Sequence, residues 1–252
     1  MTADLDGGVA IVTGAHGRLG PVWIAALASA GMRVAGVDVA SGDVRGAELV
    51  AEADVTDAAA LRGVRERVER ELGTPTVLVN NAGIDQPPDP DAAVGGIEGV
   101  SPEQFLRVLD VNARGTFVAT QAFGPAMVAA GRGSIVNIGS LYASIAPEPQ
   151  FYDHLPGFVK PPAYAASKAG VVALTRYFAR LWGPHGVRVN TLSPGGVSGD
   201  QDDEFRRKYC SRVPLGRMAE PADLTGPLLF LASDASRYLT GHELRVDGGF
   251  TA

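Results

Sequence analysis

The chain has 252 residues, of which 46% are hydrophobic and 20% are charged, and these proportions are ordinary for a soluble globular protein. It contains 22 Lys and Arg against 28 Asp and Glu, so its formal net charge is −6 and its surface repels the phosphates of nucleic acids. No stretch has the long apolar run that a membrane span requires. We therefore expect a globular protein that binds neither nucleic acid nor a membrane.

Cys210 is the only cysteine, which excludes an intrachain disulfide and a cysteine-based zinc site and agrees with a reducing compartment. No His, Asp and Glu residues have the spacing of metal ligands, so we predict no metal. The N-terminus has acidic residues where a signal peptide carries Lys or Arg. We expect a cytoplasmic protein.

Short apolar runs alternate with longer helical segments along the chain. The predicted strands are Val9–Thr13, Arg33–Asp38, Thr76–Asn80, Ser134–Gly139, Val187–Leu192 and a short last strand near Leu244–Asp247. The predicted helices are Gly20–Gly31, Asp57–Gly73, Ser101–Ala130 and Ala163–Trp182, and the segments 85–100 and 145–162 read as loops. This alternation predicts a doubly wound α/β fold, in which helices cover both faces of a parallel sheet, and one domain over residues 1–252.

Residues 13–20, TGAHGRLG, connect the first predicted strand to the first predicted helix. Gly14, Gly17 and Gly20 allow a tight turn and a close approach to the backbone, and the helix N-terminus favours a pyrophosphate. The pattern predicts a dinucleotide-binding loop; the alternative is a tight turn without a ligand.

Asp38 ends the second predicted strand, 18 residues after Gly20. A carboxylate there accepts hydrogen bonds from ribose hydroxyls and repels a 2′-phosphate, so it favours NAD over NADP. Arg18, inside the glycine loop, either pairs with a phosphate or is solvated.

The sequence YAASK places Tyr164 and Lys168 four residues apart, on one face of a helix. A free phenol has a pKa near 10 and is a poor base at neutral pH. A neighbouring ammonium favours the phenolate, so the pair is predicted to exchange a proton with a substrate hydroxyl or carbonyl. The alternative is a Tyr–Lys contact on a helix surface.

Taken in order over nearly the whole chain, these motifs resemble the short-chain dehydrogenase/reductase family, in its compact single-domain branch. The resemblance rests on TGAHGRLG, Asp38, Asp54-Val55, NNAG at 80–83, Asn112, Ser140, YAASK, SPGG at 193–196 and VDGG at 246–249. It implies a three-layer Rossmann fold, a nicotinamide cofactor, a small-molecule substrate and a homotetramer or homodimer.

The resemblance implies four catalytic residues. Tyr164 matches the acid/base, and Lys168 matches the residue that lowers the tyrosine pKa and holds the nicotinamide ribose. Ser140 matches the serine that bonds the substrate oxygen, and Asn112 matches the asparagine that holds a water in the proton relay. Taken alone, Asn112 reads as a helix residue bonded to a loop carbonyl.

The resemblance also implies the cofactor contacts, which include Tyr164 and Lys168. The remaining ones are Gly14, His16, Gly17, Arg18, Leu19 and Gly20 in the loop, Asp38, Asp54 and Val55 at the adenosine, Asn81, Ala82 and Gly83 beside its ribose, and Pro194, Gly195 and Val197 at the carboxamide.

Two features depart from the family pattern. The glycines are spaced GxxGxxG where the compact branch has GxxxGxG, which leaves the contacts of His16, Gly17 and Arg18 open. Ser140 and Tyr164 are 24 residues apart, a longer gap than the family usually has.

The extra length of that gap is the segment 145–162, which contains five prolines. We expect this insertion to form part of the substrate wall beside Ser140 and Tyr164, with polar residues such as Tyr152 and His154 facing the substrate; the alternative is a surface decoration or a subunit contact. Its polar content predicts a sugar, sugar acid or cyclitol. Residues 196–212 resemble the family's mobile substrate lid, in which Cys210 is an incidental thiol.

We therefore predict an NAD-dependent oxidoreductase that transfers a hydride between NAD(H) and a secondary alcohol or ketone. One alternative is an NADPH-dependent carbonyl or 3-oxoacyl reductase, against which Asp38 argues. A second alternative is a regulator that senses NAD without chemistry, against which the Tyr164 and Lys168 pair argues.

Overall fold

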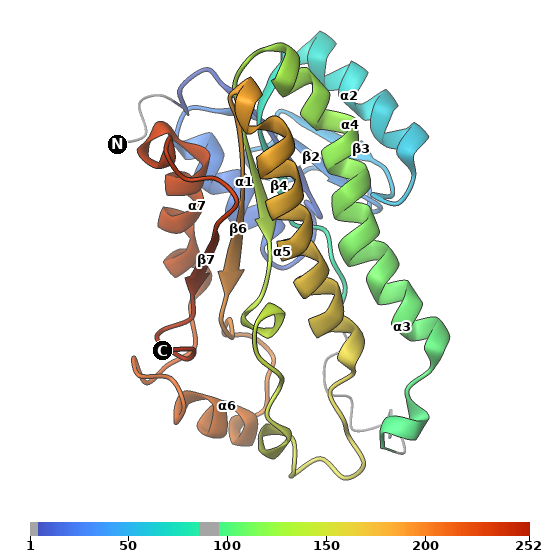
Figure 1. The fold of residues 1–252 in the computed structure, drawn as a ribbon, viewed down its shortest axis with the longest axis vertical. Helices are drawn as coiled ribbons and strands as arrows, with labels where there is room; N and C mark the ends of the chain where they lie inside the picture. Colours follow the sequence, from blue (N-terminus) through green and yellow to red (C-terminus); the bar gives the residue numbers. More distant parts are fainter. Residues whose placement is uncertain (1–4, 86–95) are drawn as a thin grey trace.

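A parallel sheet of seven strands, in the order β3-β2-β1-β4-β5-β6-β7, lies at the centre of the molecule (Figure 1). The computed structural model describes residues 5–85 and 96–252. The strands are β1 (Val9–Thr13), β2 (Arg33–Asp38), β3 (Leu49–Glu52), β4 (Pro75–Asn80), β5 (Gly133–Ile138), β6 (Val187–Pro194) and β7 (Glu243–Val246). This architecture confirms the predicted doubly wound α/β fold.

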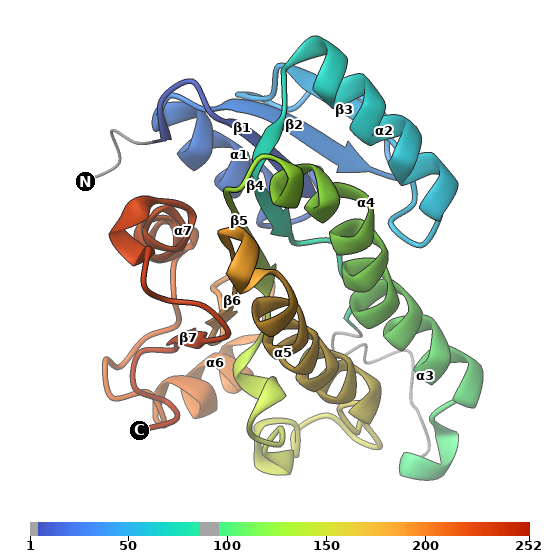
Figure 2. The same cartoon turned by 45° about the horizontal axis from the view of Figure 1, so that its top comes forward.

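The helices form a layer on each face of the sheet (Figures 1 and 2). They are α1 (Gly20–Ser29), α2 (Ala58–Glu71), α3 (Pro102–Leu109), α4 (Gly115–Ala129), α5 (Pro162–Trp182), α6 (Asp203–Cys210) and α7 (Thr225–Ala232). Alternate residues of the strands point to opposite faces, so Ile11 packs with α2, α4 and α5, whereas Ala10 and Val12 pack with α1 and α7. Two apolar clusters result, one on each side of the sheet.

The strand order reverses between β1 and β4. From β1 the chain continues outward through β2 and β3, and it then returns to β4 on the other side of β1. The loops that follow these two strands therefore diverge and leave a crevice at the carboxyl edge of the sheet, which is where doubly wound folds bind ligands.

Side chains cap the backbone at the starts of two helices. The Asp57 carboxylate accepts hydrogen bonds from the N–H groups of Ala59 and Ala60, and these bonds lower its pKa. The Ser101 hydroxyl accepts from the N–H groups at 103 and 104 at the start of α3. Both caps fix the points at which α2 and α3 begin.

The structure differs from the predicted elements in several places. The predicted helix Ser101–Ala130 is two helices, α3 and α4, joined by a π-helical turn over Asp110–Arg114. Strand β3 and helices α6 and α7 were not predicted, because β3 has only four residues and α6 lies in a strongly charged segment. Of the predicted loop 85–100, residues 86–95 lie outside the described part, and Ile97–Gly99 forms a 3₁₀ turn.

A third apolar cluster lies beyond the carboxyl edge of the sheet, where the insertion 145–162 runs beside α6 (Figures 1 and 2). The insertion contains one 3₁₀ turn, Pro149–Phe151, and Phe151 is 1% exposed. The buried members of this cluster are Leu141, Phe151, Tyr152, Phe205, Tyr209, Val213, Met218 and Phe250. The insertion is therefore packed into the protein through its aromatic side chains.

Candidate active site

A pocket of about 760 Å³ opens at the carboxyl edge of the sheet, at the predicted crevice. It runs from the glycine loop after β1, past the ends of β4 and β5, to the segment after β6. Among the predicted site residues, its walls contain Gly14, Gly17, Arg18, Leu19, Asn81, Ala82, Gly83, Ser140, Tyr152, Tyr164, Lys168, Pro194, Gly195 and Val197. The structure thus brings most of the predicted residues together in one space.

The glycine loop is packed so closely that side chains are excluded from two of its positions. Gly14 has φ +68°, and a Cβ atom there would lie 2.8 Å from the Cα of Ala82. A Cβ atom at Gly20 would lie 2.1 Å from the carbonyl oxygen of Gly14. The loop therefore presents bare backbone to the pocket at the N-terminus of α1, which is a suitable cradle for a pyrophosphate.

Asn81 fixes the glycine loop against the end of β4. Its amide nitrogen donates to the carbonyl oxygens of Thr13 and Gly14, each at 3.0 Å. Its amide oxygen accepts a hydrogen bond from the indole N–H of Trp23 at 2.8 Å. This one side chain therefore joins the ends of β1 and β4 to α1.

Asp38 lies at the end of β2, beside the glycine loop. Its carboxylate accepts hydrogen bonds from the N–H groups of His16 at 2.9 Å and Ala40 at 3.0 Å. Asp54 and Val55 follow the neighbouring strand β3; Asp54 bonds to Thr56, and Val55 is buried. His16, Gly20, Asp38, Asp54 and Val55 are not among the described residues that line the pocket.

Arg18 joins the glycine loop to the segment that follows β6. Its guanidinium donates to the carbonyl oxygen of Val197 at 3.0 Å and also to that of Ser198. Arg18 is therefore neither simply solvated nor confined to the glycine loop.

Tyr164, Lys168 and Ser140 meet at the end of β5. Tyr164 lies in the first turn of α5, one turn before Lys168, and it lines the same pocket as Ser140. The Lys168 Nζ atom lies 5.7 Å from the centre of the Tyr164 ring and donates to the carbonyl oxygen of Ile138 at 2.7 Å. The predicted helix face is thus directed into the pocket.

Burial controls the protonation of this pair. It raises the pKa of Tyr164, to which the negative charge of Asp85 adds, and the hydrogen bond from Ser140 lowers the same pKa by less. Burial also lowers the pKa of Lys168 to about 8. The predicted lowering of the tyrosine pKa by the neighbouring ammonium is therefore outweighed, and the pocket holds a protonated phenol beside an amine that titrates near neutral pH.

Asn112 lies in the π-helical turn between α3 and α4, a kind of irregularity that is frequent at functional sites. Its amide oxygen accepts from the N–H of Ile84 at 2.7 Å, and its amide nitrogen donates to the carbonyl oxygen of Ile84 at 2.9 Å and to the hydroxyl of Ser167 at 3.0 Å. These bonds match the alternative interpretation of Asn112 as a helix residue that bonds to a loop carbonyl. They also fix the segment that follows β4.

Comparisons with known proteins agree with this geometry. The model of a family described as enoyl-(acyl carrier protein) reductase matches residues 19–251. D-threitol dehydrogenase of Mycolicibacterium smegmatis is 36% identical over 98% of this chain and 94% of its own length. A short-chain dehydrogenase of Leptospira borgpetersenii, solved with bound NAD⁺, is 32% identical with a TM-score of 0.88, over 100% of this chain and 95% of that one.

The chain belongs to the short-chain dehydrogenase/reductase family. The resemblance found in the sequence motifs is thereby confirmed. Another solved member, a gluconate 5-dehydrogenase of Burkholderia cenocepacia in complex with NADP and tartrate, is 29% identical with a TM-score of 0.85, over 99% of this chain and 98% of that one. The family thus includes structures with either nicotinamide dinucleotide.

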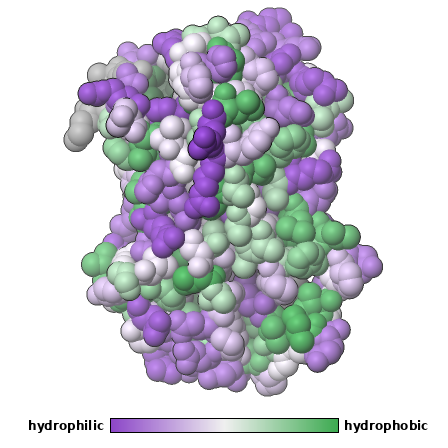
Figure 3. Space-filling model, in the orientation of Figure 1, coloured by the Kyte–Doolittle hydropathy of each residue, from purple (hydrophilic) through white to green (hydrophobic). Residues whose placement is uncertain are grey.

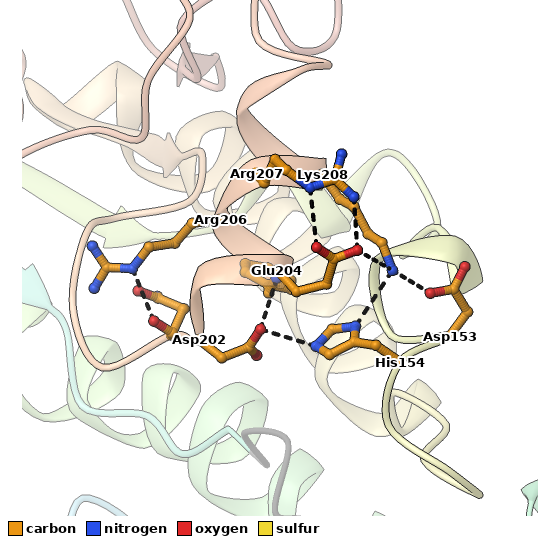
Figure 4. Close-up of polar contacts among 9 residues, drawn as sticks. Asp153, His154, Asp202, Glu204, Arg206, Arg207 and Lys208 are labelled. Carbon is orange, nitrogen blue, oxygen red and sulfur yellow. Dashed lines mark hydrogen bonds and ion pairs between the residues drawn. The ribbon is translucent and has the colours of Figure 1, made fainter.

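In this short-chain dehydrogenase/reductase, ion pairs as well as aromatic contacts join the insertion to α6 (Figure 4). Lys208 of α6 bonds to the carboxylate of Asp153 and lies 3.3 Å from that of Glu204. The His154 ring bonds to Asp202 at 2.9 Å and lies 3.4 Å from the Lys208 ammonium. Hydrogen bonds from the side chains of Arg207 and Lys208 lower the pKa of Glu204 to about 2.

The two substrate residues predicted from the insertion have different positions. Tyr152 lines the pocket, and burial raises its pKa to about 12. His154 is not among the described residues that line the pocket. Its ring bonds instead to Asp202, which does line the pocket. The aromatic side of the insertion therefore forms part of the pocket wall, and His154 contacts that wall through Asp202.

The aromatic cluster is expected to hold the insertion more strongly than its ion pairs do. The ring of Phe151 lies 6.1, 5.8 and 6.1 Å from those of Phe205, Tyr209 and Phe250. Phe151→Ala should lower the free energy of unfolding by about 3 kcal/mol or more in urea titrations. The control Asp153→Asn, at an exposed ion pair, should lower it by less than about 1 kcal/mol. Equal losses in the two variants would contradict this ranking.

Several pocket residues were not predicted from the sequence, among them Asp85, Tyr142, Leu155 and Lys160. Two of them had a usable signal. Asp85 follows the NNAG motif by two residues, and Lys160 precedes Tyr164 by four. Tyr142 and Leu155 depend on how the insertion folds back, which local sequence patterns do not specify.

Within residues 5–85 and 96–252, no three or more His, Cys, Asp or Glu side chains are grouped so that they could hold a metal ion. None of the helices in these two ranges combines the length and the apolar character of a membrane span.

Proposed function

We propose that this protein is an NAD-dependent dehydrogenase that transfers a hydride between NAD(H) and a secondary alcohol or ketone of a sugar, sugar acid or cyclitol. The observation that carries the proposal is the placement of Tyr164, Ser140 and Lys168 together at the end of β5, in the same pocket as the glycine loop. The likeness to D-threitol dehydrogenase and to a gluconate 5-dehydrogenase supports a sugar-like substrate.

The residues fit the chemistry of alcohol oxidation and carbonyl reduction. The Ser140 and Tyr164 hydroxyls hold the substrate oxygen between them, and Tyr164 moves the proton to or from that oxygen. Its raised pKa keeps the phenol protonated, which suits proton donation to a carbonyl oxygen. Lys168 contributes a nearby charge that changes around pH 8, and NAD, when bound, supplies the hydride acceptor. Asn112 holds the wall at Ile84 in place.

The residues that would hold NAD are the glycine loop, Asn81 to Gly83, Lys168 and the segment from Pro194 to Val197, with Asp38, Asp54 and Val55 at the adenosine end. Residues 196–212 form the lid in this proposal, and Arg18 links the lid to the glycine loop. The position of Asp38 beside the loop supports NAD over NADP, because its carboxylate repels a 2′-phosphate.

Removing the charge of Asp38 tests the cofactor preference. Asp38→Asn is expected to weaken NADH binding about tenfold and to strengthen NADPH binding, as measured by fluorescence titration. Asp43→Asn, at an exposed position five residues later, is the matched control and should change neither affinity. Tighter binding of NADPH than NADH to the unaltered protein would overturn the preference for NAD.

The activity itself is tested by a panel of polyols, sugars, sugar acids, cyclitols and simple ketones, with NADH or NADPH formation and consumption followed by absorbance. Turnover of sugar-like alcohols with NAD supports the proposal. Preferential reduction of 3-oxoacyl substrates with NADPH would indicate the reductase alternative. Tight NADH binding without turnover across the panel would indicate a regulator that senses NAD.

We also propose a cytoplasmic homotetramer assembled through α4 and α5. Green, hydrophobic surface is visible over this side of the molecule in Figure 3. Phe117 of α4 and Tyr177 and Leu181 of α5 are 37%, 62% and 48% exposed, which is unusual for large apolar side chains unless a partner covers them. Light scattering at micromolar concentration is expected to give the mass of four chains, and a monomer mass would refute this assembly.

A further inference from the structure

An ion pair, Asp85 with Lys160, is built into the wall of the pocket. The Lys160 ammonium lies 2.6 Å from the Asp85 carboxylate. The Lys160 side chain is only 7% exposed, and its Nζ atom lies 5.5 Å from the centre of the Tyr164 ring. A charged pair is therefore held beside the proposed proton-transfer group.

The backbone around both partners is fixed. Asp85 follows Ile84, whose N–H and carbonyl groups are both bonded to the buried side chain of Asn112. Lys160 ends the insertion two residues before α5 begins at Pro162, so the start of that helix determines its position. The pair thus joins the segment after β4 to the insertion, and both segments line the pocket.

Charges of the two signs balance along the pocket wall. Among the described lining residues, Arg18, Lys160 and Lys168 are basic, and Asp85, Asp200 and Asp202 are acidic. Arg18 is engaged with the carbonyl oxygens of the lid, and the pKa of Lys168 is lowered to about 8. The wall therefore has no surplus of positive charge with which to hold an anionic substrate.

We propose that the Asp85–Lys160 pair binds hydroxyl groups remote from the reacting carbon and selects neutral polyols over sugar acids. This inference rests on the proposed dehydrogenase function and narrows its substrate class. A carboxylate accepts hydrogen bonds and an ammonium donates them, whereas a hydroxyl does both, so neighbouring hydroxyls of a polyol match the pair. A substrate carboxylate would gain Lys160 but would also meet the like charge of Asp85.

The test compares two four-carbon probes, threitol and threonate, which differ by a terminal alcohol and a carboxylate. Their Kd values are measured by NMR titration with NADH present, so the readout does not depend on turnover. The unaltered protein is expected to bind threitol more tightly than threonate. Asp85→Asn removes the like charge that a substrate carboxylate would meet and should shift the ratio of the two Kd values toward threonate by about tenfold or more.

A second variant separates charge from structure. In the double variant Asp85→Asn with Lys160→Gln the pair is neutral again, so the preference for threitol should return; a merely structural role of Asp85 would not produce this recovery. Glu71→Gln is the matched control, because it removes a carboxylate from an exposed ion pair with Arg67 on α2, and it should leave the ratio unchanged.

The two proposals fail in different ways. An unchanged ratio in Asp85→Asn, or tighter binding of threonate by the unaltered protein, would overturn the role of the pair. Selective binding of threitol without oxidation of any alcohol in the panel would support the pair and count against the dehydrogenase function instead.

Discussion

Tyr164→Phe is expected to lower turnover by about 10²- to 10⁴-fold while the variant still folds and binds NADH. The substitution keeps the ring and removes only the hydroxyl, which is the group proposed to move the proton. The rate is measured with the best alcohol of the panel, and binding is measured by NADH fluorescence.

Tyr238→Phe provides the control for this prediction. Tyr238 follows α7, and it is fully exposed. It should retain normal turnover. Near-normal turnover in Tyr164→Phe would remove Tyr164 from the proposed chemistry.

Lys168→Met is expected to abolish most activity and yet to stabilise the fold at pH 7. The ammonium is 5% exposed, and burial lowers its pKa from 10.5 to about 8, so near pH 7 the charged lysine destabilises the folded state by about 3 kcal/mol. Loss of its hydrogen bond to the Ile138 carbonyl offsets about 1 kcal/mol of this. A net gain of about 2 kcal/mol should appear in urea titrations.

The pH dependence of that difference gives a sharper check. Because the folded pKa lies below the unfolded one, the unfolded chain binds more protons between the two values, and stability from this group rises with pH. From about pH 7 to about pH 9.5 the unaltered protein should gain about 2 kcal/mol relative to Lys168→Met. A difference independent of pH would show that Lys168 keeps its ordinary pKa in the folded protein.

Much of the fold could be predicted because its signals are local. The strands β1 and β2 are short runs that contain β-branched residues, as is typical of buried strands in parallel sheets. Their predicted bounds agree with the structure. The placement of Tyr164 and Lys168 on one face of a helix could likewise be predicted, because it follows from the helical period alone. Strand β3 escaped prediction because four residues carry no periodicity, and its place is determined by pairing with β2.

The chemistry of the site could be predicted only in part, because it depends on burial. The sequence places an ammonium one turn from a phenol, but the sign of the net effect on the Tyr164 pKa follows from how deeply β5 and the insertion enclose the ring. His154 was expected in the pocket because it is polar and belongs to the insertion; its ring bonds to Asp202 of the segment before α6 instead. Contacts between distant segments decided both outcomes.

The shared aromatic cluster of the insertion and α6 has a consequence for altering specificity. Phe151 and Tyr152 pack against Phe205 and Tyr209, so neither segment keeps its shape when the other is exchanged alone. To transfer substrate preference between relatives of this enzyme, residues 145–162 and 196–212 therefore have to be exchanged together. Directed-evolution libraries that randomise both stretches jointly should yield more folded clones than libraries that vary either by itself.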